Sequence, residues 1–202
     1  MKSPLGLILN GVLFLLIFIG AGCAGFQGLK RYTGPEYEAE TSSWQEQIRE
    51  HAGNGMWLVT RGYHSGDDVV AIATVSSLSH AAVLDLESQT VIEAIGQGVV
   101  ETRLQKFLSQ CHRVVLVRPD DWTITKGAKA VASARGKLGE KYDFLGTVGL
   151  PREKRWYCSE LAVWSMGIPV NRQGPQNVLH PRSMLKMGTI LFDSGQRDGQ
   201  PD

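Results

Sequence analysis

The sequence predicts an α+β domain with a mostly antiparallel sheet of five or six strands and one main helix packed against a face of that sheet. Short runs of β-branched and other apolar residues follow one another with brief polar turns between them, which is typical of an antiparallel meander. Two other segments, 123–138 and 158–166, repeat small and apolar residues at helical spacing. A chain of about 180 residues after the N-terminal segment is enough for one ordinary domain with its own core.

The first expected elements are short. Residues 44–51 are predicted to form a helix and residues 56–61 the first strand. Residues 62–67 form a turn, and Asp67 or Asp68 is placed to cap a short helix over 69–74. Three strands then follow at 80–84, 91–95 and 99–102, joined by turns at 85–89 and 96–98.

The second half of the chain contains the two main helices. Residues 104–108 fit a helical turn, and a strand over 112–118 ends at Pro119, which cannot donate to a ladder. Gly139 is placed to end the first main helix, and Gly167 and Pro169 to end the second. A last strand is expected at 189–192.

The N-terminus has the pattern of a bacterial lipoprotein signal. Lys2 precedes an apolar stretch, residues 5–19, which as a helix would span only about 22 Å against roughly 30 Å for a hydrocarbon core. Small residues then lead to Cys23, which the lipoprotein peptidase accepts, and Gly20 departs from the leucine of the usual pattern. We expect residues 1–22 to be a cleaved signal peptide and Cys23 to carry the lipid anchor, such as palmitate. A retained or differently cleaved anchor is the alternative.

The remaining chain divides into three parts. Residues 23–43 show no apolar period and are predicted to be a lipid-anchored linker. Residues 44–194 form the folded domain, and the Gly-, Gln- and Asp-rich residues 195–202 are predicted to be a disordered tail.

Composition excludes several functions. The 21 basic and 20 acidic residues of the whole chain become 20 of each once Lys2 is removed, so no nucleic-acid partner is expected. The histidines other than His80 show no paired ligand spacing, and the chain has neither a His-Glu-x-x-His nor a Cys-x-x-Cys motif. The chain also lacks a glycine-rich phosphate loop, so the sequence predicts no metal and no cofactor.

Cys158 is the candidate nucleophile because it opens the second main helix, where N–H groups and the helix dipole favour a thiolate. His80, at the head of a predicted strand, is the candidate base. Glu93 lies on the strand expected to pair with that of His80, where cross-strand side chains are about 5 Å apart, so it is the first candidate to orient the imidazole. Glu160 and Asp143 are the alternatives.

Other residues have weaker assignments. The backbone N–H of Cys158 is the general oxyanion donor, while Tyr142 and Ser159 are candidates to line the oxyanion or substrate site. Cys111 runs into an apolar strand and is expected to be a buried structural residue. In an export compartment a disulfide between Cys111 and Cys158 is the alternative, and it would leave Cys158 without a thiol to act as the nucleophile.

Six segments, taken in order, resemble the circularly permuted, papain-like NlpC-related group that includes YiiX-like bacterial proteins. The resemblance covers roughly residues 57–193 and implies a papain-like fold with Cys158 as nucleophile, His80 as base and then acid, and Glu93 as orienting carboxylate. His64 departs from the pattern and could occupy the mouth of the site. The segments are Gly66-Asp67-Asp68, Ser79-His80-Ala81-Ala82-Val83, Val91-Ile92-Glu93-Ala94, Gly98-Val99-Val100, Tyr142-Asp143 and Tyr157-Cys158-Ser159-Glu160-Leu161.

The resemblance and the N-terminal signal together imply an exported, lipid-anchored cysteine hydrolase, an amidase or peptidase of the cell envelope. Its expected substrates are cell-wall (peptidoglycan) peptides. Because Ala24 rather than aspartate follows Cys23, the outer membrane facing the periplasm is expected in a diderm host. The alternatives are a lipid acyl hydrolase or acyltransferase of the lecithin:retinol acyltransferase type, and a non-catalytic envelope binding module.

Overall fold

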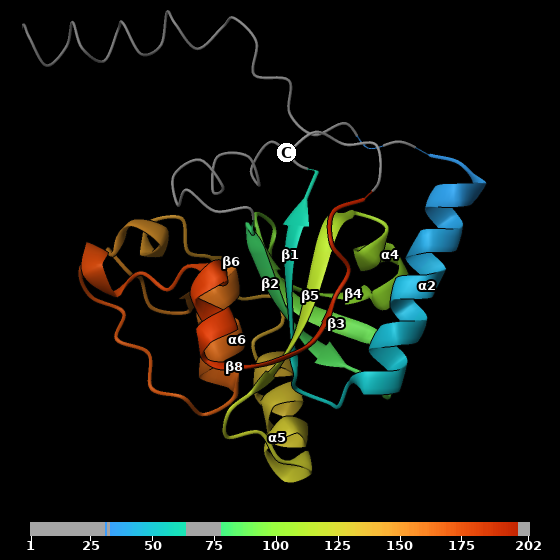
Figure 1. Cartoon of the computed structure of the whole chain (residues 1–202). Helices are drawn as coiled ribbons and strands as arrows, with labels where there is room; N and C mark the ends of the chain where they lie inside the picture. Colours follow the sequence, from blue (N-terminus) through green and yellow to red (C-terminus); the bar gives the residue numbers. More distant parts are fainter. Residues whose placement is uncertain (1–30, 32, 64–77, 198–202) are drawn as a thin grey trace, which may run out of the picture.

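The computed structural model describes residue 31 and residues 33–63 and 78–197 (Figure 1). A six-stranded sheet with the strand order β4-β3-β2-β1-β5-β8 forms its centre. Every neighbouring pair in this sheet is antiparallel, which confirms the predicted α+β class and strand number. The strands are β1 (Trp57–Gly62), β2 (His80–Asp85), β3 (Thr90–Ile95), β4 (Gly98–Arg103), β5 (Cys111–Pro119) and β8 (Gly188–Asp193).

Helices cover both faces of the sheet. On one face α5 (Ile124–Arg135) and α6 (Cys158–Ser165) enclose a core that includes Trp57, Val83 and Ile92. On the other face α2 (Pro35–His51) and α4 (Leu104–Leu108) enclose a second core around Leu58 and Leu84. The helix that begins at Cys158 therefore packs against one face of the sheet, as predicted.

The start of α2 corrects the predicted domain boundary. The helix begins at Pro35, so residues 35–43 of the expected linker are helical and belong to the folded domain. Its buried residues, Tyr37, Thr41, Trp44 and Ile48, recur at helical spacing. This helical spacing is hard to recognise in the sequence, because two of the four buried residues, Tyr37 and Thr41, are not purely apolar.

The chain end corrects the predicted tail, because Arg197 is almost fully buried against α2. Its guanidinium lies 3.9 Å from the ring centroids of both Tyr37 and Trp44 and donates to Glu40 at 2.5 Å. It also donates to the carbonyl oxygen of Cys111 at 2.8 Å. The tail through Arg197 is thus an ordered part of the domain, and residues 198–202 lie outside the described residues.

Replacing Arg197 by alanine is expected to lower the free energy of unfolding by about 3 kcal/mol, because it removes a buried cation and leaves main-chain carbonyls unpaired. Urea unfolding measures the loss. The matched control is Arg113→Ala, which removes a partly exposed pair with Asp193 and should cost about 1 kcal/mol or less. Equal losses in the two variants would contradict the account of Arg197.

A second, two-stranded parallel sheet leads into α6. It joins β6 (Lys141–Tyr142) to β7 (Arg155–Trp156), and Asp143 N–H donates to Trp156 C=O at 3.0 Å. Further along α6, Trp57 Nε1 donates to the Ala162 carbonyl at 3.0 Å and so ties the helix to β1. These contacts fix the start of α6 relative to the main sheet.

Among the described residues, no helix is both long and apolar enough to cross a membrane. The apolar stretch 5–19, Cys23, His64 and the helix expected over 69–74 lie outside the described residues.

Candidate active site

Cys158 is the first residue of α6, as the sequence predicts. The preceding residue, Tyr157, is the N-cap, and Glu160 lies in the first turn. The Cys158 side chain is buried, and the backbone N–H groups of Ala81 on β2 and Ser159 on α6 donate to its sulfur. Because the first N–H groups of a helix have no partner within it, this end of α6 is a suitable place for negative charge.

His80 and Glu93 meet across two neighbouring strands. The register pairs Ala82 with Glu93, so His80 is a diagonal neighbour of Glu93, close to the predicted cross-strand position. His80 Nε2 and Glu93 Oε2 are 2.7 Å apart. The other carboxylate oxygen of Glu93 accepts a hydrogen bond of 2.6 Å from the Thr102 hydroxyl on β4. Both oxygens of Glu93 are therefore held in place.

The Cys158 sulfur and the His80 side chain are hydrogen-bond partners. Since Nε2 of His80 faces Glu93, Nδ1 is the nitrogen left for the sulfur. The described residues thus contain a continuous polar chain from Cys158 through His80 and Glu93 to Thr102.

The pKa values of Cys158 and His80 move in opposite directions. Burial by itself raises the pKa of the Cys158 thiol, but the hydrogen bond and positive charge of His80 outweigh it and lower that pKa. Burial likewise lowers the pKa of His80, but its bonds to Cys158 and Glu93 raise it well above the ordinary value. These opposite shifts favour a thiolate next to an imidazolium, which is a nucleophile next to a proton donor.

The two neighbours of Cys158 in sequence both bind the backbone of Leu179, in the segment after α6. The Leu179 N–H donates to the Tyr157 hydroxyl at 3.1 Å, and the Ser159 hydroxyl donates to the Leu179 carbonyl at 2.5 Å. Burial raises the pKa of Tyr157 to about 12, so its hydroxyl stays neutral. The Ser159 hydroxyl makes this contact, and the Ser159 N–H donates to the Cys158 sulfur.

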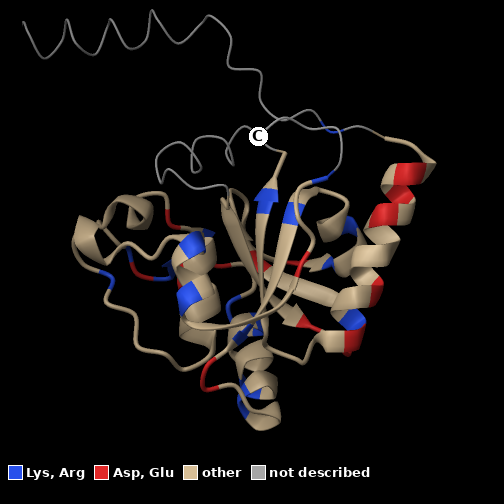
Figure 2. Ribbon diagram, in the orientation of Figure 1, with Lys and Arg blue, Asp and Glu red and all other residues tan. Residues whose placement is uncertain are grey.

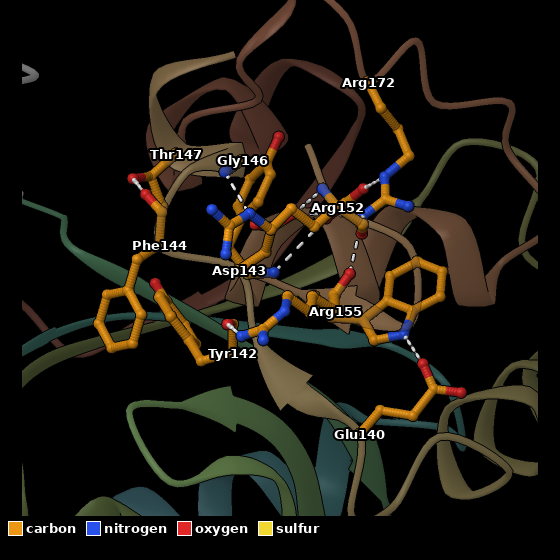
Figure 3. Close-up of polar contacts among 12 residues, drawn as sticks. Glu140, Tyr142, Asp143, Phe144, Gly146, Thr147, Arg152, Arg155 and Arg172 are labelled. Carbon is orange, nitrogen blue, oxygen red and sulfur yellow. Dashed lines mark hydrogen bonds and ion pairs between the residues drawn. The ribbon is translucent and has the colours of Figure 1, made fainter. Parts of the chain in front are cut away.

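A buried ionic cluster supports the start of α6. Arg172 pairs with Glu160, donates to the Arg155 carbonyl at 2.7 Å and lies 3.4 Å from an oxygen of Asp143. Asp143 in turn accepts the N–H groups of Gly146 and Arg152 (Figure 3). Glu160 and Asp143, the alternative partners for His80, are thus both engaged with Arg172, while Glu93 is the acid that contacts the imidazole.

The structure also shows the surroundings of two weaker candidates, Tyr142 and Cys111. The Tyr142 ring packs on Phe144 with 4.7 Å between centroids, and its carbonyl accepts from Arg155 (Figure 3). Cys111 is a buried thiol outside any disulfide, and it donates to the Phe107 carbonyl at 3.2 Å, as expected of a structural residue. Cys158 is likewise outside any disulfide, so the alternative disulfide is not formed in this structure.

Sequence reasoning missed Thr102 and Arg172. Thr102 had a signal, because it is two residues beyond Val100, the cross-strand partner of Glu93, and so lies on the same face of the sheet. Arg172 had none, since its contacts join α6 to loops far apart in the sequence.

A thiol at a helix start beside a strand histidine, on an antiparallel sheet, defines a papain-like cysteine hydrolase arrangement. Residues 63–183 match the permuted papain-like amidase family, YaeF/YiiX, also called the C92 family. The chain belongs to this family and is a cysteine-hydrolase-like enzyme. This identification confirms the resemblance found in the sequence.

The fold is similar to a crystal structure described as metalloprotein yiiX from Escherichia coli O157:H7. The TM-score is 0.56 at 19% identity, and the match covers 73% of this chain and 98% of that chain. Within the part of this chain that the structure describes, no group of three or more His, Cys, Asp or Glu residues could hold a metal ion. The described residues therefore do not fit a metal site. No curated protein matches the chain.

Replacing Glu93 by glutamine is expected to lower the pKa of His80, because the variant keeps the size of the side chain and loses its charge. NMR titration of the His80 ring measures this change, and amide hydrolysis should fall about 100-fold or more. Glu101→Gln, on the exposed part of β4, is the matched control. An unchanged His80 titration in Glu93→Gln would contradict the role of Glu93.

Proposed function

We propose that this protein is an exported, lipid-anchored cysteine amidase that cleaves amide bonds in cell-wall peptides. Cys158 is the nucleophile, His80 the general acid and base, and Glu93 the carboxylate that orients the ring. The observation that carries the proposal is the preformed chain from Cys158 through His80 to Glu93, with the pKa values of the thiol and the imidazole shifted in opposite directions.

The chemistry follows the ordinary course of acyl transfer. The Cys158 thiolate attacks the amide carbon, and the resulting oxyanion accepts a hydrogen bond from the Cys158 N–H at the helix start. The His80 imidazolium gives its proton to the leaving nitrogen, so the amine departs and a thioester remains. Water then attacks the thioester while His80 takes its proton. The acid is released, and the thiolate and imidazolium are restored.

The N-terminal residues support the location. The apolar stretch 5–19 and the small residues before Cys23 match a lipoprotein signal, and Ala24 favours transport to the outer membrane of a diderm host. An enzyme anchored there and facing the periplasm would meet peptidoglycan peptides, which are rich in amide bonds.

A substrate comparison tests the function. The chain from residue 24 onward contains every described helix and strand, and we expect it to release amines from soluble peptidoglycan peptides but not fatty acids from phospholipid vesicles. His80→Ala should lose the peptide activity. Fatty-acid release without peptide cleavage would replace the amidase by a lipid acyl hydrolase, and the absence of both activities would favour a binding module.

A further inference from the structure

The loop between β6 and β7 exposes a dense group of apolar side chains. Phe144, Leu145, Val148 and Leu150 have 64%, 38%, 54% and 62% of their surfaces exposed. They make up four of the seven large exposed hydrophobic residues in the described part of the chain. Single exposed apolar residues are common on soluble proteins, but four within one short loop form a patch that indicates a binding surface.

The loop holds these side chains outward by its own internal bonds. The buried Asp143 carboxylate accepts the N–H groups of Gly146 at 3.0 Å and Arg152 at 2.9 Å, which ties the two arms of the loop together (Figure 3). The Thr147 hydroxyl donates to the Phe144 carbonyl at 2.7 Å. Gly149, at φ 83°, lies so close to the Gly174–Pro175 peptide that a Cβ would clash. The patch is therefore built into the fold, and little ordering is required before it binds.

Basic residues flank the apolar patch. Lys141 and Arg152 are exposed on either side of it, and Lys154 follows with Glu153 as the single exposed acid between them. Acidic residues instead gather on α2, on the opposite side of the molecule from β6 (Figures 1 and 2). An exposed apolar loop with cations on both flanks, on the opposite side of the molecule from the acidic helix α2, is complementary to an anionic lipid bilayer.

We propose that residues 141–154 form a membrane-docking loop. Phe144, Val148 and Leu150 enter the boundary between headgroups and acyl chains, and Lys141, Arg152 and Lys154 contact the anionic headgroups. The loop leads directly into β7 and the start of α6, so docking sets the orientation of Cys158 relative to the bilayer. This role is independent of the reaction at Cys158 and adds a second membrane contact to the one proposed for Cys23.

Vesicle flotation tests the proposal with the chain from residue 24 onward, which lacks Cys23. The chain should float with vesicles of equal parts phosphatidylglycerol and phosphatidylethanolamine, and less with phosphatidylcholine vesicles or at high salt. Phe144→Ser with Leu150→Ser should weaken the partition about tenfold or more, since two apolar side chains no longer enter the bilayer. The matched control is Ile124→Ser on α5, at a residue that is 80% exposed outside the loop, and it should not change the partition.

Three outcomes would overturn the docking loop. They are no flotation of the parent chain, an equal loss in the Ile124→Ser control, and unchanged flotation of the double variant. Loss of peptide cleavage in the double variant without any flotation of the parent would assign the loop to substrate binding instead. Alkylation of Cys158, measured in the same preparations, reports separately on the site, so failure of docking and failure of the amidase are distinguishable.

Discussion

Replacing Cys158 by alanine is expected to abolish amide hydrolysis, with a loss of about 10⁴-fold or more in turnover. The thiol is the only protein group of the proposed mechanism that bonds to the acyl carbon, so no neighbouring side chain can replace it. Turnover of a peptidoglycan peptide measures the effect. Binding of that peptide should persist, because the rest of the site is unchanged.

Cys111→Ala is the matched control for this variant. It removes the other described thiol, which is buried at the start of β5 and donates to the Phe107 carbonyl of α4. The control should retain its turnover and lose only stability. If Cys158→Ala kept its activity, or if Cys111→Ala lost it to the same extent, the assignment of the nucleophile would be wrong.

Replacing Arg172 by alanine is expected to lower the free energy of unfolding by about 3 kcal/mol. Glu160 and Asp143 are both fully buried, and Arg172 is the cation that the structure places between them. Without it, two carboxylates at the base of α6 would repel each other in a poorly solvated site. Burial already raises the pKa of Glu160, so the variant should take up a proton there on folding, and its stability should improve toward acidic pH.

Urea unfolding at several pH values measures this prediction. Arg172→Lys, which keeps the charge without the planar fork, should recover part of the loss, and Arg182→Ala, at an exposed position, should cost little. A positioning role for Arg172 predicts in addition that kcat falls more than KM changes, because the start of α6 shifts. If Arg172→Ala were as stable as Arg182→Ala, the proposed contribution of the Arg172 cluster to stability would be wrong.

The sequence allowed the core of the fold and the site to be predicted because these depend on local patterns. Alternating apolar residues and short turns located the meander from β2 to β4, and the pairing of β2 with β3 follows from the turn between them. That pairing alone brings His80 within reach of Glu93. The apolar run after Cys158 and the glycine that follows it, Gly167, predict the helix that begins at Cys158.

The remaining features depend on contacts between distant segments. The pairing of β8 with β5, the burial of Arg197 against α2 and the bond between Arg172 and Glu160 each join residues that no local pattern relates. The sequence did not predict the N-terminal half of α2, because two of the residues that it buries, Tyr37 and Thr41, carry hydroxyl groups and do not form an apolar pattern. A charged residue near a chain end is ordinarily expected to be exposed to solvent. The burial of Arg197 becomes favourable through its tertiary packing on two aromatic rings, Tyr37 and Trp44.

The most direct test of the Cys158–His80 ion pair is the rate at which Cys158 reacts with iodoacetamide as a function of pH, in the parent chain and in His80→Ala. The rate for the parent should rise at a lower pH than the rate for an ordinary thiol, because His80 lowers the pKa of the Cys158 thiol. In His80→Ala the rise should move to higher pH, since burial then raises the pKa of the thiol with only the backbone N–H groups of Ala81 and Ser159 acting against it. Superimposable profiles for the two proteins would contradict the ion pair, and with it the proposed mechanism.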